Sequence, residues 1–232
     1  MKIGAVGFGN RIAHVYFELN KINPEAKMVA YVDPQPIGKK FAEENNFFPS
    51  TQYKTLEDML AVEKLDLLMV GSPNHLHLEH IKIGLESGVR IFAEKPIVVN
   101  EEQTWQLAEL IKQYGRDNII VGLVLRYSQH ARSVAALIEK DQLGKIISLE
   151  ASEHIMPWHG GFFMRNWRRK AAYSGSFILE KCCHDLDFYS MVVGCRPKRV
   201  ASFGGRRSFI AANSPILEGK ENLDVYKEYN LE

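Results

Sequence analysis

Two glycines near the start of the chain have the spacing of a loop that can hold a phosphate group. Gly7 and Gly9 lie directly after a short apolar segment and directly before a segment of helical period. In such a loop the first glycine allows a tight turn, the second lets the backbone approach a pyrophosphate, and the helix N-terminus offers free N–H groups. The pattern predicts a dinucleotide site; the alternative is a strand-to-helix turn in which the glycines serve geometry alone.

One residue of this loop departs from the usual fingerprint. Ile12 stands where a small third residue normally allows close packing of helix and strand, so we expect the first helix to stand slightly further from its sheet. The residues expected around the phosphates are Gly7, Phe8, Gly9, Asn10, Arg11 and Ile12.

Asp33 closes the second apolar segment, where an acidic side chain accepts hydrogen bonds from a ribose and repels a 2′-phosphate. It therefore predicts NAD as the cofactor in preference to NADP. Two alternatives stay open. Asp33-Pro34 also has the composition of a simple turn. Lys39 and Lys40 could neutralise an extra phosphate or belong to a solvated helix face.

A second group of polar residues shares one face of a helix predicted at 176–193. Glu180, His184 and Asp187 fall at i, i+4 and i+7. The opposite stripe is apolar and comprises Ile178, Cys182, Tyr189 and Val193. We expect that stripe to pack into its domain, with the polar face lining a cleft or exposed to solvent. His184 suits a general base because its pKa lies near neutrality. The group lacks a second histidine or a cysteine cluster, so no metal is expected.

The elements that position these residues alternate over the first 120 residues between short apolar runs and segments of helical period. This alternation is typical of βαβ units and predicts a Rossmann domain with a parallel sheet at 1–121. Asn100 is expected to cap a helix that begins at Glu101. The candidate strands are 2–6, 28–32, 66–70, 89–93 and 118–121.

The rhythm changes after residue 121, and a second domain of α+β type is expected at 122–232. A Gly-, Trp- and Arg-rich stretch separates its elements. Helices are predicted at 129–140 and 176–193, and strands at 145–154 and 198–204. Because two strands do not make a stable sheet, this open sheet would be incomplete. The predicted fold class is thus α/β, a Rossmann domain followed by an α+β domain.

Composition excludes several classes of protein. A formal net charge of +1 predicts no strong attraction to nucleic acid or membrane. No apolar run approaches the roughly 18 to 20 residues that cross a bilayer, and the early glycine loop leaves no room for a signal peptide. Three cysteines without Cys-x-x-Cys spacing favour buried, reduced thiols, so a cytoplasmic protein is expected.

Read together, several segments resemble the glucose-fructose oxidoreductase, inositol dehydrogenase and MocA (Gfo/Idh/MocA) family, from residue 1 to about residue 205. The most specific part is Glu94-Lys95-Pro96, preceded by Pro73-Asn74 and His77. The other matching segments are Gly7 to Gly9 with Asp33, Gly122 to Tyr127, Trp167-Arg168, Gly175, and Glu180 to Asp187.

The resemblance implies roles for individual residues. Lys95 would orient the substrate and help to transfer the proton of its hydroxyl, and His184 would act as the general base. Glu180 would assist at a position where many members have Asp. Arg126, Trp167 and Asp187 would lie near the substrate. Further cofactor contacts are implied for Ser72, Pro73, Asn74, His77, Glu94 and Lys95.

The resemblance also implies the reaction, a hydride transfer between NAD and a sugar, cyclitol or related polyhydroxy compound. Two alternatives remain: an enzyme that uses NAD transiently in glycosidic cleavage or epimerisation, and a dinucleotide-binding protein without catalysis. Family members are usually longer than 300 residues and often assemble through the second sheet. We therefore expect a shortened chain and, in the full-length protein, a homo-oligomer.

Overall fold

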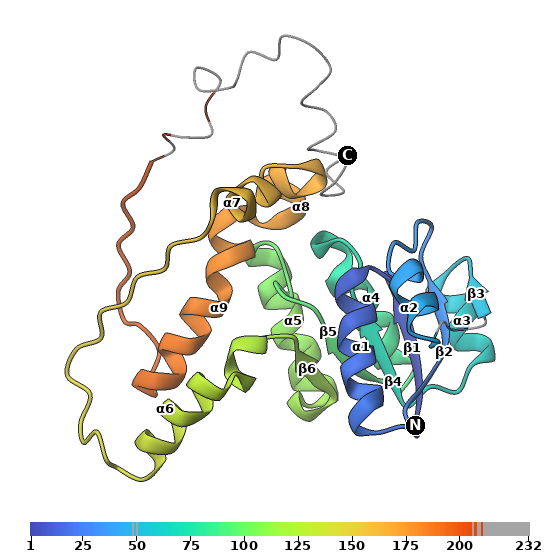
Figure 1. Cartoon of the computed structure of the whole chain (residues 1–232), viewed down its shortest axis with the longest axis horizontal. Helices are drawn as coiled ribbons and strands as arrows, with labels where there is room; N and C mark the ends of the chain where they lie inside the picture. The colour runs from blue at the N-terminus through green and yellow to red at the C-terminus, as the bar shows by residue number, and fades with distance from the viewer. Residues whose placement is uncertain (48, 50, 206, 208–209, 211–232) are drawn as a thin grey trace. The chain divides into compact units, whose positions relative to one another are not determined.

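The computed structural model describes residues 1–47, 49, 51–205, 207 and 210 (Figure 1). The chain forms two compact units. The first contains Met1–Leu123 together with the short segment Ala172–Gly175. The second contains Val124–Ala171 and the described residues from Ser176 onward.

The first unit is built on a six-stranded parallel sheet with the strand order β3-β2-β1-β4-β5-β6. The parallel sheet predicted from the sequence is confirmed, and the five predicted strands agree with the structure to within one residue at each end. The strands are β1 (Lys2–Val6), β2 (Lys27–Val32), β3 (Thr51–Tyr53), β4 (Leu67–Val70), β5 (Arg90–Ala93) and β6 (Ile119–Val121). Strand β3 escaped prediction because it is short and contains the polar residues Thr51 and Gln52, whereas the equally short β6 at the opposite edge is apolar throughout.

Helices cover both faces of this sheet, as the apolar strands require. Helices α1 and α2 supply one core cluster with Ile12, Tyr16 and Ala42, while α3, α4 and α5 supply the other with Met59 and Ile81 among others. The helices are α1 (Asn10–Ile22), α2 (Lys39–Glu44), α3 (Leu56–Val62), α4 (His77–Glu86) and α5 (Glu101–Tyr114).

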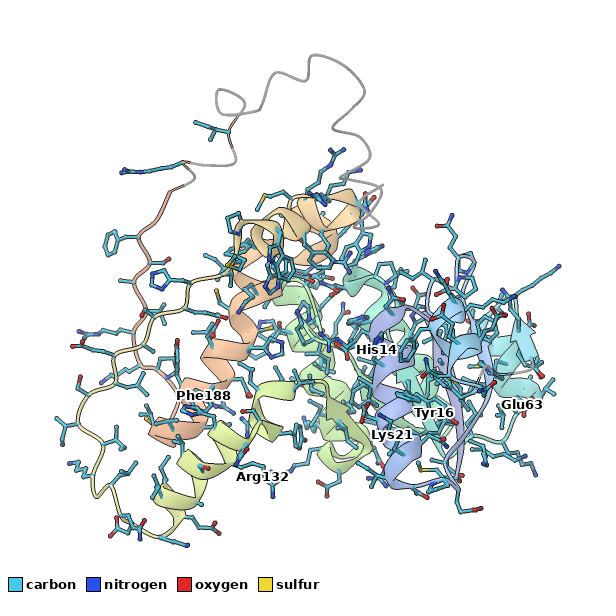
Figure 2. The ribbon with its side chains drawn as sticks, in the orientation of Figure 1. His14, Tyr16, Lys21, Glu63, Arg132 and Phe188 are labelled. Carbon is cyan, nitrogen blue, oxygen red and sulfur yellow. The ribbon has the colours of Figure 1, made fainter. Side chains whose placement is uncertain are left out.

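Local hydrogen bonds fix these helices in place. The Asn100 side chain accepts a hydrogen bond from the N–H of Gln103 at 2.8 Å, which confirms the predicted cap of α5. Helix α1 is joined to β2 by Tyr16, labelled in Figure 2, whose hydroxyl donates to Ala26 O and accepts from the N–H of Met28, both at 3.1 Å. The loop at the start of α1 is therefore held by an anchored helix.

Helices are the regular secondary structure in the part of the second unit that the structure describes, and they are joined by long irregular segments. The predictions of helices at 129–140 and 176–193 are confirmed by α6 and α9. The helices are α6 (Gln129–Glu139), α7 (Pro157–Phe163) and α9 (Ser176–Val193), while the short α8 (Ala171–Ser174) lies mostly in the segment that belongs to the first unit. The strands predicted at 145–154 and 198–204 are wrong: neither segment forms a strand.

The reason is that an extended segment gains its backbone hydrogen bonds only by pairing with another strand. The described residues supply no partner to either segment, and apolar side chains such as Ile147 and Val200 are each 82% exposed. The expected α+β sheet is therefore not formed within the described part of the second unit. No helix among the described residues is long and apolar enough to span a membrane.

Candidate functional site

The phosphate loop predicted at Gly7 and Gly9 joins β1 to α1. Gly7 has a φ of +81°, and a Cβ built on it would lie 2.2 Å from the backbone nitrogen of Ser72. Gly7 is therefore required by the fold itself. Gly9 differs, because a Cβ there would meet no atom within 4 Å. Nothing in the described part of the chain requires glycine at position 9, which fits a backbone that a ligand approaches.

The N-terminus of α1 offers an anion site. Gly9 is the N-cap and contributes no side-chain hydrogen bond, and the first turn contains no acidic residue. The exposed Arg11 in that turn adds positive charge. Free backbone N–H groups and the positive end of a 13-residue helix therefore converge beside Gly9, an arrangement that fits the pyrophosphate of a dinucleotide.

The large side chain of Ile12 fits between α1 and the sheet because a small residue stands at another position, Gly71. Its side chain lies over Gly71, directly after β4, where a Cβ would lie 2.2 Å from Ile12 Cγ1 and 2.9 Å from Gly7 O. Glycine at position 71 thus makes the room that a small residue at position 12 usually makes. The sequence offered no signal of this exchange, since the two residues meet only in the folded sheet.

Asp33 follows β2 at the carboxyl edge of the sheet. Its Oδ1 accepts a hydrogen bond from the N–H of Gln35 at 2.7 Å, so the Asp33-Pro34 turn does form. The same residue lines a pocket of about 410 Å³ with Pro34, Gln52, Tyr53 and Lys54. The turn and a ribose-binding role are therefore compatible. Lys39 is exposed and lies 3.6 Å from Glu43, as expected on a solvated helix face.

The loop after β4 contains Ser72, Pro73 and Asn74, of which Ser72 and Asn74 are buried. The Asn74 amide donates to the backbone carbonyl of Ser174 at 3.3 Å, and the ring of His75 stacks on Tyr173 with the centroids 4.5 Å apart. The segment Ala172–Gly175 thus packs on this loop and belongs to the first unit.

His77 lies beneath this loop, with 1% of its surface exposed. Its Nε2 lies 2.8 Å from Ser72 O, and its Nδ1 lies 2.9 Å from Pro96 O. Burial lowers the pKa of His77 to about 4, so the ring is neutral at pH 7 and carries one N–H. The side chain therefore connects the loop after β4 to the loop after β5, and its ring nitrogens face backbone carbonyls.

Glu94, Lys95 and Pro96 form the loop after β5. Glu94 is 8% exposed, and a Cβ on Gly122 would lie 3.1 Å from its Oε1, so the two loops after β5 and β6 meet closely. Lys95 is half-buried. The carboxyl ends of neighbouring parallel strands thus gather the predicted cofactor residues of the first unit at one edge of the sheet, where ligands bind in open α/β sheets.

In the second unit, Glu180 of α9 is buried beside Arg168. The Arg168 Nε lies 3.7 Å from Glu180 Oε1, and its guanidinium stacks over the rings of Phe162 and Trp167 at 4.2 and 4.4 Å. Burial lowers the pKa of Arg168. Arg168 therefore belongs to a packed aromatic and ionic cluster.

Arg126 and Asp187, both predicted near the substrate, bind each other. The Arg126 Nε and Nη2 donate to Asp187 Oδ2 and Oδ1 at 2.6 and 2.7 Å, a bidentate pair that raises the pKa of Arg126. His184, on the same helix, is half-buried. The pair fixes η3 (Val124–Tyr127) against α9.

The expectation that the apolar stripe of α9 packs inward is wrong for Ile178 and Val193, whereas Cys182 and Tyr189 are half-buried. Ile178 is 57% and Val193 41% exposed, whereas the buried residues of α9 are Glu180 and Lys181. The physical reason is ionic: Lys181 pairs with Glu153 and with Asp185, and Glu180 faces Arg168. Partners from 153–168 therefore cover the charged face of the helix.

The Lys181 cluster was missed from the sequence, where only the i, i+4 spacing of Lys181 and Asp185 signals it. The hydrogen bond from Lys181 lowers the pKa of Glu153. A pocket of about 240 Å³ lies beside the cluster and is lined by Glu153, Ile155, Phe177, Lys181, Cys182, Asp185, Leu186 and Tyr189.

None of the three cysteines forms a disulfide; Cys182 and Cys183 are half-buried, while Cys195 is exposed, so the expectation of burial is wrong for Cys195. Among the residues that the structure describes, no group of three His, Cys, Asp or Glu side chains could hold a metal ion.

Comparison with known proteins supports this architecture. Residues 1–123 match the model of an oxidoreductase family with an NAD-binding Rossmann fold, and residues 131–214 match the GFO/IDH/MocA C-terminal domain. The solved structure of scyllo-inositol dehydrogenase from Lactobacillus casei with bound NAD(H) and scyllo-inositol is similar in fold. Its TM-score is 0.65 at 22% identity, over 84% of this chain and 56% of that chain.

Curated relatives are similar over most of this chain. Identity is 27% over 191 residues to 2,7-anhydro-N-acetylneuraminate hydratase of Mediterraneibacter gnavus, covering 81% of this chain and 49% of the relative. It is 25% over 197 residues to inositol 2-dehydrogenase of Corynebacterium glutamicum, covering 84% and 55%. The chain spans about half the length of the curated relatives it matches. With more than half of its residues matched by the N-terminal model, the chain belongs to the Gfo/Idh/MocA oxidoreductase family, whose N-terminal part is an NAD-binding Rossmann fold.

Proposed function

We propose that the chain forms the cofactor-binding part and part of the catalytic half of an NAD-dependent oxidoreductase that acts on a CH–OH group of a sugar, cyclitol or related polyhydroxy compound. The observation that carries the proposal is the loop between β1 and α1. Gly9 is not required by the packing of the protein, and it lies beside uncapped N–H groups at a helix N-terminus.

The preference for NAD over NADP is supported by Asp33. Its carboxylate lines a pocket at the carboxyl end of β2 and would accept hydrogen bonds from the ribose hydroxyls. A 2′-phosphate in the same place would be repelled by the negative charge. Exposed Lys54 lines the pocket as well, so the selectivity is expected to be marked and not absolute.

In the loop after β5, Lys95 would hold the substrate oxygen and help to move its proton. Pro96 restricts Lys95 to extended backbone, and Glu94 is buried beneath it against Gly122. When bound, NAD supplies the chemistry of hydride exchange with the substrate carbon. The protein's task is to orient the reacting groups and to control the proton.

In the second unit, His184 is proposed as the general base that takes or returns the hydroxyl proton, and Glu180 as its assisting carboxylate. Trp167 and the Arg126–Asp187 pair would contact the substrate. The proposal is supported by the spacing of these residues on α9 and by the packed cluster around Arg168.

The first experiment is a titration of the purified chain with NADH and with NADPH, followed by energy transfer from its tryptophans. Saturable binding with NADH tighter than NADPH is expected. A folded sample that binds neither would overturn the proposal. With a substrate found in a polyol screen, Lys95→Ala should abolish turnover and leave NADH binding largely intact, and unchanged turnover would remove Lys95 from the mechanism.

A second candidate is a reaction without net oxidation, in which NAD is reduced and reoxidised within one turnover. It is favoured by the similarity to a protein named 2,7-anhydro-N-acetylneuraminate hydratase. The two candidates differ in one measurement. Net accumulation of NADH with substrate excludes the second, whereas product formation at constant NADH with exchange of a substrate hydrogen supports it.

A further inference from the structure

We propose that Gln52 on the edge strand β3 is a positioning residue that sets the preference for NAD over NADP by holding Asp33 in place. The inference rests on the proposed function and extends it to a residue outside the family motifs described above. Gln52 touches Asp33 and need not touch the cofactor.

The contact is a chain of three hydrogen bonds. The Tyr31 hydroxyl donates to Gln52 Oε1 at 3.0 Å, and Gln52 Nε2 donates to the backbone carbonyl of Asp33 at 2.8 Å. The Asp33 carboxylate in turn accepts the N–H of Gln35 at 2.7 Å. The first bond fixes which end of the Gln52 amide faces Asp33, because its oxygen is already engaged by Tyr31.

The register of the sheet explains why a side chain is needed there. Strand β2 pairs with β3 up to Val32, which lies beside Tyr53, and the pairing ends at that point. Asp33 is the next residue, and its carbonyl has no ladder partner in β3. The Gln52 amide supplies the missing donor, since a backbone carbonyl at a strand end must be satisfied by a side chain or by water.

Tyr31 is itself held firmly. It is 3% exposed, and its ring lies 5.4 Å from that of Phe8 in the phosphate loop. Burial and the negative charge of Asp33 raise the pKa of Tyr31, so its hydroxyl remains a donor at neutral pH. A ring contact thus connects the phosphate loop to Tyr31, and two hydrogen bonds lead from Tyr31 through Gln52 to Asp33.

Fixing both the carbonyl and the carboxylate of Asp33 holds its charge at one place in the pocket. A carboxylate so placed loses little conformational entropy when it binds the ribose hydroxyls. Because it cannot turn away, it also keeps its negative charge close to a 2′-phosphate. A mobile Asp33 would bind NADH less tightly and would turn away from a 2′-phosphate. Loss of the Gln52 side chain should therefore reduce the difference between the dissociation constants for NADH and NADPH.

The test measures dissociation constants for NADH and NADPH with the full chain. Gln52→Ala should raise the Kd for NADH about three- to fivefold, the scale of one partly exposed hydrogen bond, and change that for NADPH less than about twofold. Tyr31→Phe should change the ratio of the two dissociation constants in the same direction, but by a smaller factor. Gln106→Ala is the matched control, because its side-chain amide donates to Glu102 Oε1 at 3.3 Å on the exposed face of α5.

A double-mutant cycle separates positioning from a general structural role. In an Asp33→Ala background, Gln52→Ala should have almost no further effect on NADH binding. Equal weakening of both cofactors, or an undiminished effect without Asp33, would overturn the inference while leaving the proposed function standing. A folded wild-type chain that binds neither cofactor would overturn both.

Discussion

Alanine substitutions at the two glycines of the phosphate loop should have opposite consequences. Gly9→Ala should leave the stability of the chain nearly unchanged and weaken dinucleotide binding. Gly7→Ala should destabilise the fold. The contrast follows from what a Cβ would meet at each position: open space at Gly9, and the backbone of the β4 loop at Gly7.

The magnitudes can be worked out separately. Gly9 has φ −81° and ψ 174°, which alanine adopts freely. The stabilisation from the lower entropy of the unfolded chain and the loss from the poorer N-cap should therefore offset each other within about 1 kcal/mol. Gly7 combines a φ of +81° with an overlap against Ser72. The left-handed conformation costs about 1–2 kcal/mol and overpacking about 1–3 kcal/mol more, for a total of about 2–5 kcal/mol.

The binding effect at Gly9 should be large because the added methyl group would occupy the space of the pyrophosphate. Overpacking of about 1–3 kcal/mol corresponds to a Kd for NADH raised roughly 5- to 150-fold. Stability is measured by urea denaturation and binding by tryptophan energy transfer. If Gly9→Ala bound NADH as tightly as the wild type at unchanged stability, the assignment of the loop to a pyrophosphate would be refuted.

Three further predictions concern stability. Burial lowers the pKa of His77 to about 4, so the unfolded chain binds a proton at this histidine more readily than the folded chain does. The free energy of unfolding should therefore be highest above about pH 6.5 and should fall by up to about 3 kcal/mol as the pH drops towards 4. In His77→Asn that slope, measured by urea titrations across pH, should flatten. Gly71→Ala should cost about 1–3 kcal/mol in the wild-type background and less in an Ile12→Ala background, which is itself destabilised by the loss of a buried side chain. Additive losses in the double variant would contradict the packing of Ile12 over Gly71. Arg168→Leu should cost about 2–4 kcal/mol by stranding the buried carboxylate of Glu180, and Arg168→Leu with Glu180→Gln should be more stable than Arg168→Leu alone in thermal unfolding.

The sheet could be predicted from the sequence because most of its strands are apolar runs, which can be recognised without knowing which strands pair with them. The edge strand β3 could not be predicted, since Gln52 is polar and three residues are too few to show a period. The sequence also offered no sign that Gly71 provides the space that a small residue at position 12 usually provides. Those two residues lie on different elements, and only the parallel pairing of β1 with β4 brings them together.

The second unit was predicted less well for a related reason. Its helices α6 and α9 follow from local periodicity, but the predicted strands needed partners that local sequence does not reveal. On α9, hydrophobicity indicated the wrong buried face. Glu180 and Lys181 are buried because charged partners from distant segments neutralise them, and a stripe of apolar residues carries no information about such partners.

The short segment Ala172–Gly175 makes the first unit discontinuous in sequence. A fragment that ended near residue 123 would carry every strand of the sheet and yet lack part of its own surface. Asn74 would lose the carbonyl of Ser174, and His75 would lose the ring of Tyr173. A dissection of this protein that aims at an autonomous cofactor-binding fragment should therefore graft these four residues back, or expect a weakened loop at the edge where the dinucleotide would bind.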